Sequence, residues 1–119
     1  CYDNGTSLGH ELWEHSQGKN WDDKRWLRYV THGTYHMKWT LESMSREGHI
    51  SGVQKFADLF PVLRGQMVAQ LSAFDMAALR DILNCLTEIP MVVPLSTWRA
   101  NLICRLVGLR RDLLLEVLL

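Results

Sequence analysis

The chain has 119 residues, of which 47% are hydrophobic and 22% are charged. This length and composition exclude a disordered protein and predict a single folded domain that is large enough to bury a core. The 13 basic and 13 acidic residues give a formal net charge of zero, which excludes a globally basic nucleic-acid-binding protein. A local basic stripe is still compatible with this balance.

The three cysteines, Cys1, Cys85 and Cys104, do not have the spacing of a metal site. Two of them lie in apolar segments, which is typical of reduced, hydrophobic side chains inside a cell. A Cys85–Cys104 disulfide in a secreted protein is the alternative. No apolar run is long enough to span a bilayer, so no membrane partner is expected. The first residue and the polar stretch after it would also suit a secreted chain with a lipid anchor on Cys1.

Residues 1–19 are polar and contain three glycines, which predicts a flexible N-terminal arm. The remaining residues, 20–119, are predicted to form a single helical domain. Its first helix is expected over 21–31, because Asn20 is a favourable N-cap and two aspartates follow in the first turn.

Six further helices are predicted from apolar residues that recur every three to four positions. They are expected over residues 35–46, 50–60, 62–71, 75–87, 97–107 and 111–119. Gly48, Pro61 and Gly108 separate neighbouring helices, and Pro90 and Pro94 keep the stretch between them out of a helix. No segment predicts a strand. The sequence therefore predicts an all-α fold of six or seven short helices, paired as antiparallel hairpins in a repeat-like array or an orthogonal bundle.

An internal repeat becomes visible when the sequence is shifted so that residue 67 falls on residue 102. Residues 67–84 then align with 102–119 without a gap, and most of the large apolar residues fall on apolar residues. Ala73 falls on Gly108, at the predicted break between two helices. Repeats of this length that contain two helices are typical of helical-hairpin arrays.

Thr34-Tyr35 and Thr97-Trp98 each place a threonine and an aromatic residue at the start of a predicted helix. Leu102-Ile103 follows in the second of these helices, and Met44 to Gly48 ends the first. With these motifs, residues 34–119 resemble the pentatricopeptide family, whose repeats are pairs of antiparallel helices. The resemblance implies a right-handed solenoid, an organellar location such as the mitochondrion, and binding of single-stranded RNA.

Met37 and Ala100 stand at the family's base-selecting position, where Asn, Thr or Ser would be expected. The basic character that is usual for RNA-binding members is also missing. The resemblance therefore implies a scaffold role inside a ribonucleoprotein and does not imply recognition of particular bases.

No arrangement of residues predicts catalysis, a metal or a cofactor. The spacing of His10 and His15 places them on different sides of a helix. His32 and His36 have the i, i+4 spacing of zinc ligands, but a predicted helix boundary separates them and no third ligand follows at a suitable distance. We therefore expect no enzyme activity and no small-molecule substrate.

Aromatic and basic side chains are interleaved between residues 21 and 29. Trp21, Trp26, Arg28 and Tyr29 are predicted to form a partner-binding surface, because Trp, Tyr and Arg are enriched at protein interfaces. Packing of these aromatic residues in the core and stacking on RNA bases are the alternatives.

Three arginines, Arg105, Arg110 and Arg111, flank Gly108 and form a candidate phosphate contact for RNA. Charge compensation at helix ends in solvent is the alternative explanation for them. The apolar end of the last predicted helix, residues 113–119, either closes the domain's own core or docks on another subunit.

Together these features predict a non-catalytic helical scaffold subunit of a larger assembly. The expected assembly is an organellar ribonucleoprotein, a ribosome or an RNA-processing complex, with other protein subunits as partners and RNA as a further contact. The alternative is a stand-alone helical module that binds proteins and no nucleic acid.

Overall fold

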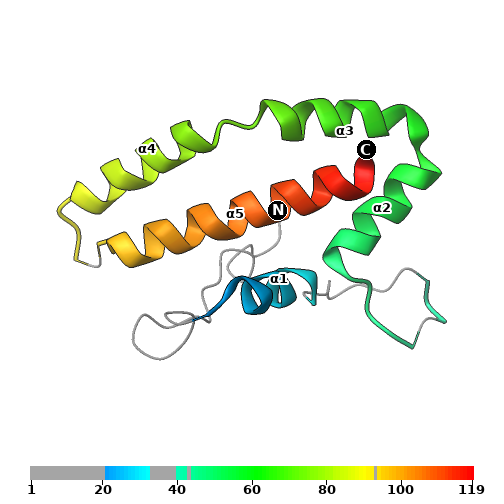
Figure 1. The fold of residues 1–119 in the computed structure, drawn as a ribbon, viewed down its shortest axis with the longest axis horizontal. Helices are drawn as coiled ribbons and strands as arrows, with labels where there is room; N and C mark the ends of the chain where they lie inside the picture. Colours follow the sequence, from blue (N-terminus) through cyan, green and yellow to red (C-terminus); the bar gives the residue numbers. More distant parts are fainter. Residues whose placement is uncertain (1–20, 33–39, 43, 93) are drawn as a thin grey trace. The chain divides into compact units, whose positions relative to one another are not determined.

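The computed structural model describes residues 21–32, 40–42, 44–92 and 94–119. Within these residues the chain forms five α-helices and no strand (Figure 1). The helices are α1 (Asp23–Thr31), α2 (His49–Leu59), α3 (Pro61–Ala73), α4 (Met76–Glu88) and α5 (Thr97–Leu118). The predicted all-α class is confirmed, but the described part of the chain holds fewer helices than the six or seven expected. None of the described helices is both long and apolar enough to cross a membrane.

The helix predicted over residues 35–46 is wrong where the structure describes this segment. Residues 40–42 and 44–46 form turns, bends and irregular backbone, while 35–39 and 43 lie outside the described residues. Leu41, one of the apolar residues on which the prediction depends, is 97% exposed, and so is Met44. A helix this short is stable only when one face packs against other parts of the protein, and neither side chain provides such packing.

Residues 97–118 form one continuous helix, so the predicted break at Gly108 is wrong. Glycine inside a helix costs only about 1 kcal/mol relative to alanine. The neighbouring leucines and arginines are good helix formers, and Leu106 is completely buried, so its packing outweighs that cost. One glycine is therefore not enough to end a helix whose neighbours favour helical structure.

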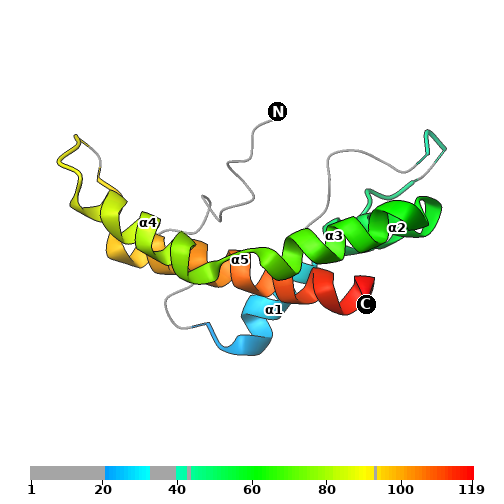
Figure 2. The ribbon, with the colours of Figure 1, turned by 90° about the horizontal axis from the view of Figure 1, so that it is seen from above.

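The described residues belong to two compact units, and α5 contributes to both. The first unit contains Trp21, Asp22 and the described part of residues 75–109, that is, α4 and the greater part of α5. In this unit α4 lies alongside α5 (Figure 1, Figure 2). The core that joins the two helices consists of Leu83, Ala100 and Cys104 and, packed against them, Leu79, Leu95 and Ile103.

The second unit contains α1, α2, α3 and the last residues of α5, in the described parts of 23–74 and 110–119. α2 and α3 contact each other, and α3 has no buried residue. The single domain predicted over 20–119 stays a prediction, and the arm predicted over 1–19 lies outside the described residues. The buried residues among those described in this unit are Trp26, Val30, Gly52, Ala57 and Leu118.

Polar caps determine where α4 and α5 begin. Asp75 Oδ1 accepts hydrogen bonds from the backbone N–H groups of Ala77 at 2.8 Å and Ala78 at 3.0 Å. Ser96 Oγ accepts a hydrogen bond from the Arg99 N–H at 3.1 Å. Such caps satisfy N–H groups that have no partner within the helix, and each contributes about 1 kcal/mol to stability.

A network of polar side chains lies at the start of α2. Lys55 Nζ donates to Glu47 Oε2 at 2.6 Å, and Ser51 Oγ donates to Glu47 Oε1 at 2.5 Å. The hydrogen bond from Lys55, followed by the one from Ser51, lowers the pKa of Glu47 from its usual value. A carboxylate just before a helix is also favoured by the positive end of the helix dipole.

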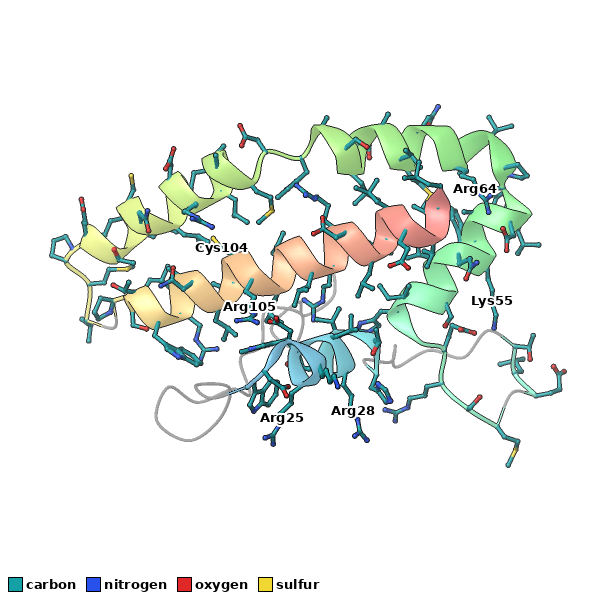
Figure 3. All side chains as sticks on the ribbon, viewed as in Figure 1. Arg25, Arg28, Lys55, Arg64, Cys104 and Arg105 are labelled. Atoms are coloured by element: carbon teal, nitrogen blue, oxygen red, sulfur yellow. The ribbon has the colours of Figure 1, made fainter. Side chains whose placement is uncertain are left out.

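Cys85 and Cys104 are both free thiols, so no disulfide joins them. Cys104 is buried in the core between α4 and α5 (Figure 3). Cys85 is exposed on α4. The prediction of a small buried hydrophobe therefore holds for Cys104 and is wrong for Cys85.

We expect a maleimide probe to label Cys85 in the folded protein, because the reagent can reach an exposed thiol. Cys104 should react only after unfolding, since its packing against Leu83 and Ala100 shields the sulfur. Mass spectrometry of the labelled peptides, with and without denaturant, measures each site separately. Equal labelling of both without denaturant would contradict the core between α4 and α5.

The substitution Gly108→Ala is expected to stabilise the protein by about 0.5–1 kcal/mol, because alanine has the higher helix propensity. A Cβ atom built at this position lies 3.5 Å from Met76 Cε, which is an ordinary van der Waals contact. Urea unfolding followed by circular dichroism measures the change. Gly65→Ala in α3 is the matched control, because nothing lies within 4 Å of a Cβ built there. If Gly65→Ala stabilised the protein and Gly108→Ala destabilised it, residue 108 would not lie inside a continuous helix.

Lys55→Gln should raise the pKa of Glu47 towards its usual value, because it removes the largest cause of the lowering. Ser51→Ala should raise that pKa by less, since its hydrogen bond is the second cause. An NMR titration of the side-chain carboxyl carbons measures both. Because the folded-state pKa is lowered, Glu47 adds stability above its unfolded-state pKa, and this contribution is lost as the pH falls through the folded-state pKa. An unchanged Glu47 pKa in Lys55→Gln would contradict the network.

Candidate interaction surface

α2 and α3 meet at a single residue, Phe60, without a connecting loop (Figure 1). Its φ of −126° and ψ of 67° lie outside the helical region, and Pro61 is the first residue of α3. Proline suits this position because the first N–H of a helix has no helical partner, and its ring keeps the preceding residue out of helical geometry. Two backbone hydrogen bonds hold the junction: the Phe60 N–H donates to the Phe56 carbonyl at 3.0 Å, and the Leu63 N–H to the Phe60 carbonyl at 2.9 Å.

Large apolar side chains around this junction stay exposed. We define the α2–α3 corner as Phe56, Leu59, Phe60, Val62 and Leu63. Val62 is 85% exposed and Leu59 is 62% exposed, and the other three are also exposed. The ring centroids of Phe56 and Phe60 lie 4.8 Å apart, so the two rings form one apolar surface. Single exposed apolar residues are ordinary, whereas clusters of them are typical of interaction sites.

The polar border of the corner and the composition of α3 agree with this interpretation. Arg64 Nη2 donates to the Asp58 carboxylate, and both side chains are partly exposed (Figure 3). A rim of charge around an apolar centre is typical of protein interfaces. α3 has a single charged residue, Arg64, and apolar residues around its whole circumference, yet none of them is buried. Helices that are apolar all round are normally covered by other elements, so α3 has surface left for a partner.

A second exposed apolar row runs along α4. Ile82, Leu86 and Ile89 are spaced to follow one side of the helix as far as its C-cap, and each is exposed. Leu79 and Leu83 belong to the core that α4 shares with α5. α4 therefore carries more apolar surface than its pairing with α5 covers.

The contact residues predicted between 21 and 29 differ in their exposure. Trp26 is only 4% exposed, so its ring belongs to the interior and not to a contact surface. Trp21 and Tyr29 are half-buried, whereas Arg28 is exposed. Trp26 therefore packs in the core, which is one of the alternatives predicted from the sequence. A partner contact through Arg28 and Tyr29 stays a prediction.

The three arginines predicted to contact phosphate are distributed around α5. On a continuous helix, Arg105 lies about 140° from Arg110 and about 120° from Arg111 around the axis. Arg105 is exposed, and the other two are half-buried. Arg111 donates to Asp112 Oδ1 from Nε at 3.0 Å and from Nη2 at 2.8 Å. Because α5 does not break at Gly108, the three side chains do not form one patch on one side of the helix.

Within the described residues, no three His, Cys, Asp or Glu side chains lie close enough to hold a metal ion. His10, His15 and His36 lie outside the described part of the chain. His32 follows α1, and its Nδ1 lies 3.0 Å from the carbonyl oxygen of Arg28. The same carbonyl accepts a hydrogen bond from the His32 N–H at 2.9 Å, so the ring contact is local to the C-terminal end of α1.

No protein family, no curated protein and no solved structure matches this chain. The resemblance to pentatricopeptide repeats therefore stays an expectation from the sequence. The exposed apolar cluster at the α2–α3 corner is the feature of the described surface that bears most directly on function.

The residues of the corner are not among the site residues predicted from the sequence. In the sequence they belong to the apolar faces of two predicted helices, 50–60 and 62–71, and such faces are normally buried. The signal that distinguishes them is the density of large apolar residues on both sides of Pro61. A single chain of this size has few elements with which to cover such a junction, and only the structure shows that it stays open.

Proposed function

We propose that this chain is a non-catalytic helical scaffold subunit of a larger assembly, and that protein partners cover its α2–α3 corner. The observation that carries the proposal is the exposure of large apolar side chains around one loop-free junction. Burial of apolar surface is the main favourable contribution to protein association. The corner, with its aromatic residues and its charged rim, has the composition that such interfaces share.

Burial of the corner would contribute enough free energy to hold a partner. Fully burying a Leu, Val or Phe side chain contributes about 1.5–3 kcal/mol. Val62 is 85% exposed and Leu59 is 62% exposed, so folding of the chain provides only the smaller part of this free energy of burial. Each would therefore add roughly 1–2 kcal/mol to binding, and Phe56, Phe60 and Leu63 would add further amounts.

The assembly that we propose is a ribonucleoprotein in an organelle, as the resemblance in the sequence implies. Its RNA would bind elsewhere than the corner, because an apolar surface with one ion pair at its rim suits a protein and not a phosphate backbone. The arginines of α5 support this part of the proposal only weakly, since they do not share one side of the helix. The exposed basic residues Lys24, Arg25 and Arg28 of α1 support it more strongly.

Replacing both Leu59 and Val62 by Gln should weaken partner binding by at least ~10-fold, because two apolar side chains lose their burial in the complex. The fold should be unaffected, since both side chains are exposed in the isolated chain. The tagged protein is captured from its native cells, the proteins recovered with it are identified, and their affinities for the purified chain are measured. Equal affinities for the variant and the unmodified protein would refute the corner as the docking site.

Leu41→Gln with Met44→Gln is the matched control, because these two side chains are each 97% exposed but lie outside the corner. This control should bind the same partners with unchanged affinity.

The isolated protein also distinguishes the two functions predicted from the sequence. A scaffold subunit should self-associate or unfold without cooperativity, whereas a stand-alone module should be monomeric and unfold in one cooperative transition. The second result, with no RNA recovered, would favour the stand-alone module.

A further inference from the structure

α1 carries its basic residues on one side. Lys24 and Arg28 have i, i+4 spacing, and Arg25 and Arg28 have i, i+3 spacing, so the three lie next to one another on the helix surface. His32 continues this row, and the four residues fall within an arc of about 100° around the helix axis. All four are exposed, and the side chains of Arg25 and Arg28 leave α1 on the same side (Figure 3). We call Lys24, Arg25, Arg28 and His32 the α1 basic face.

The two buried residues of α1 lie on its opposite side. Trp26 and Val30, the buried residues of this helix, lie about 170° around the axis from the centre of the basic face. Their burial fixes the rotation of α1 and holds the basic face outward. Asp23, the acidic residue of α1, lies outside the arc, so the arc contains no negative side chain of this helix.

Helix stability alone does not explain where these basic residues stand. Lys24 and Arg25 lie in the first turn of α1, where the positive end of the helix dipole repels cations and favours carboxylates. Arg28 in the last turn is favoured by the same dipole. A sequence that favoured only the stability of α1 would carry acidic residues at 24 and 25. Lys24 therefore stands where the helix dipole disfavours a cation, and an anionic ligand would compensate that cost.

The composition of the basic face identifies the kind of anion. The arc contains no apolar residue and no Phe, Tyr or Trp, so it lacks the apolar centre that a protein interface needs. Trp26 and Val30 are buried, and Leu27 is the exposed apolar residue of α1, at 43% exposure, so little of this helix is left to insert into a membrane surface. Clustered Lys and Arg are sufficient for a nucleic-acid backbone, whose binding is driven by neutralisation of phosphates and release of counterions. The face has no Phe, Tyr or Trp, so it lacks the large aromatic platforms on which single-stranded bases stack.

We infer that the α1 basic face binds the phosphate backbone of a nucleic-acid strand without reading its bases. The inference rests on the proposed function for the identity of the natural strand, which is the RNA of the proposed ribonucleoprotein. It assigns the RNA contact to α1 in place of the arginines of α5. Lys24, Arg25 and Arg28 supply the permanent positive charge of this contact.

The test measures binding of a fluorescent oligouridine of about 20 nucleotides to the full chain. If three cations neutralise phosphates, the logarithm of the association constant should fall against the logarithm of the salt concentration with a slope of about −2. The double variant Lys24→Gln/Arg28→Gln should reduce the slope to about −0.7 and weaken binding by at least ~10-fold at about 50 mM salt. No binding by the unmodified protein at that salt, or an unchanged slope in the variant, would overturn the inference.

Two further variants separate binding from folding. Arg80→Gln is the matched control, because Arg80 is exposed on a different helix, α4, and it should change neither the affinity nor the slope. Lys24→Glu places an acidic residue in the first turn of α1, so it should raise the unfolding temperature while it lowers the affinity for oligouridine. If both quantities fell together, the loss of binding would come from unfolding and the inference would be overturned.

Other anionic ligands complete the test. Oligothymidine DNA of the same length should show the same salt slope, because both strands have the same phosphates. A more than ~10-fold higher affinity for one of the two oligonucleotides would overturn a contact with phosphates alone. Binding to phosphatidylserine vesicles without binding to either oligonucleotide would also overturn it. Failure of the scaffold function would be distinguishable, because corner variants should still bind oligouridine and α1 variants should still capture the protein partners.

Discussion

Both compact units depend on the continuity of α5. This 22-residue helix supplies buried side chains to each of them, Leu118 to the second unit and Ala100, Leu102, Cys104 and Leu106 to the first. Helix formation is cooperative, so the packing of either end stabilises the backbone of the whole element. A single glycine costs too little to interrupt it. With α5 intact, α4 has a long partner surface, and the terminal leucines have a helix that holds them in place.

α2 and α3 bury few side chains, and this scarcity connects the fold to the proposed function. α2 buries Gly52 and Ala57, which are small, and α3 buries no residue. Several of the larger apolar side chains of these helices lie exposed at the α2–α3 corner. A partner that covers them stabilises the folded chain by mass action, so folding and assembly become linked. Such linkage is what we expect of a subunit whose stable form is the assembled one.

The sequence predicts some elements well and others poorly, and the difference has a physical cause. α4 agrees closely with its prediction because an apolar stripe, the N-cap Asp75 and the prolines that follow all favour the same boundaries. The helix expected over 35–46 fails because periodicity cannot show whether a face finds something to pack against. For the same reason, apolar spacing does not distinguish Ala57, which is buried, from Val62, which is exposed. The basic residues of α1 can be placed on one face from their spacing, but only the burial of Trp26 shows that this face is outward.

The loop-free junction at Phe60 affects the entropy of binding. Many interaction surfaces are carried by loops that must become ordered when a partner arrives, and this ordering subtracts from the affinity. In the α2–α3 corner no loop exists, because one non-helical residue ends α2 and Pro61 restricts the backbone that follows. The apolar side chains therefore lie on helices, and the backbone that carries them is already ordered before a partner binds. A partner loses only its own freedom and that of a few side chains, so a modest apolar area can give a stable complex.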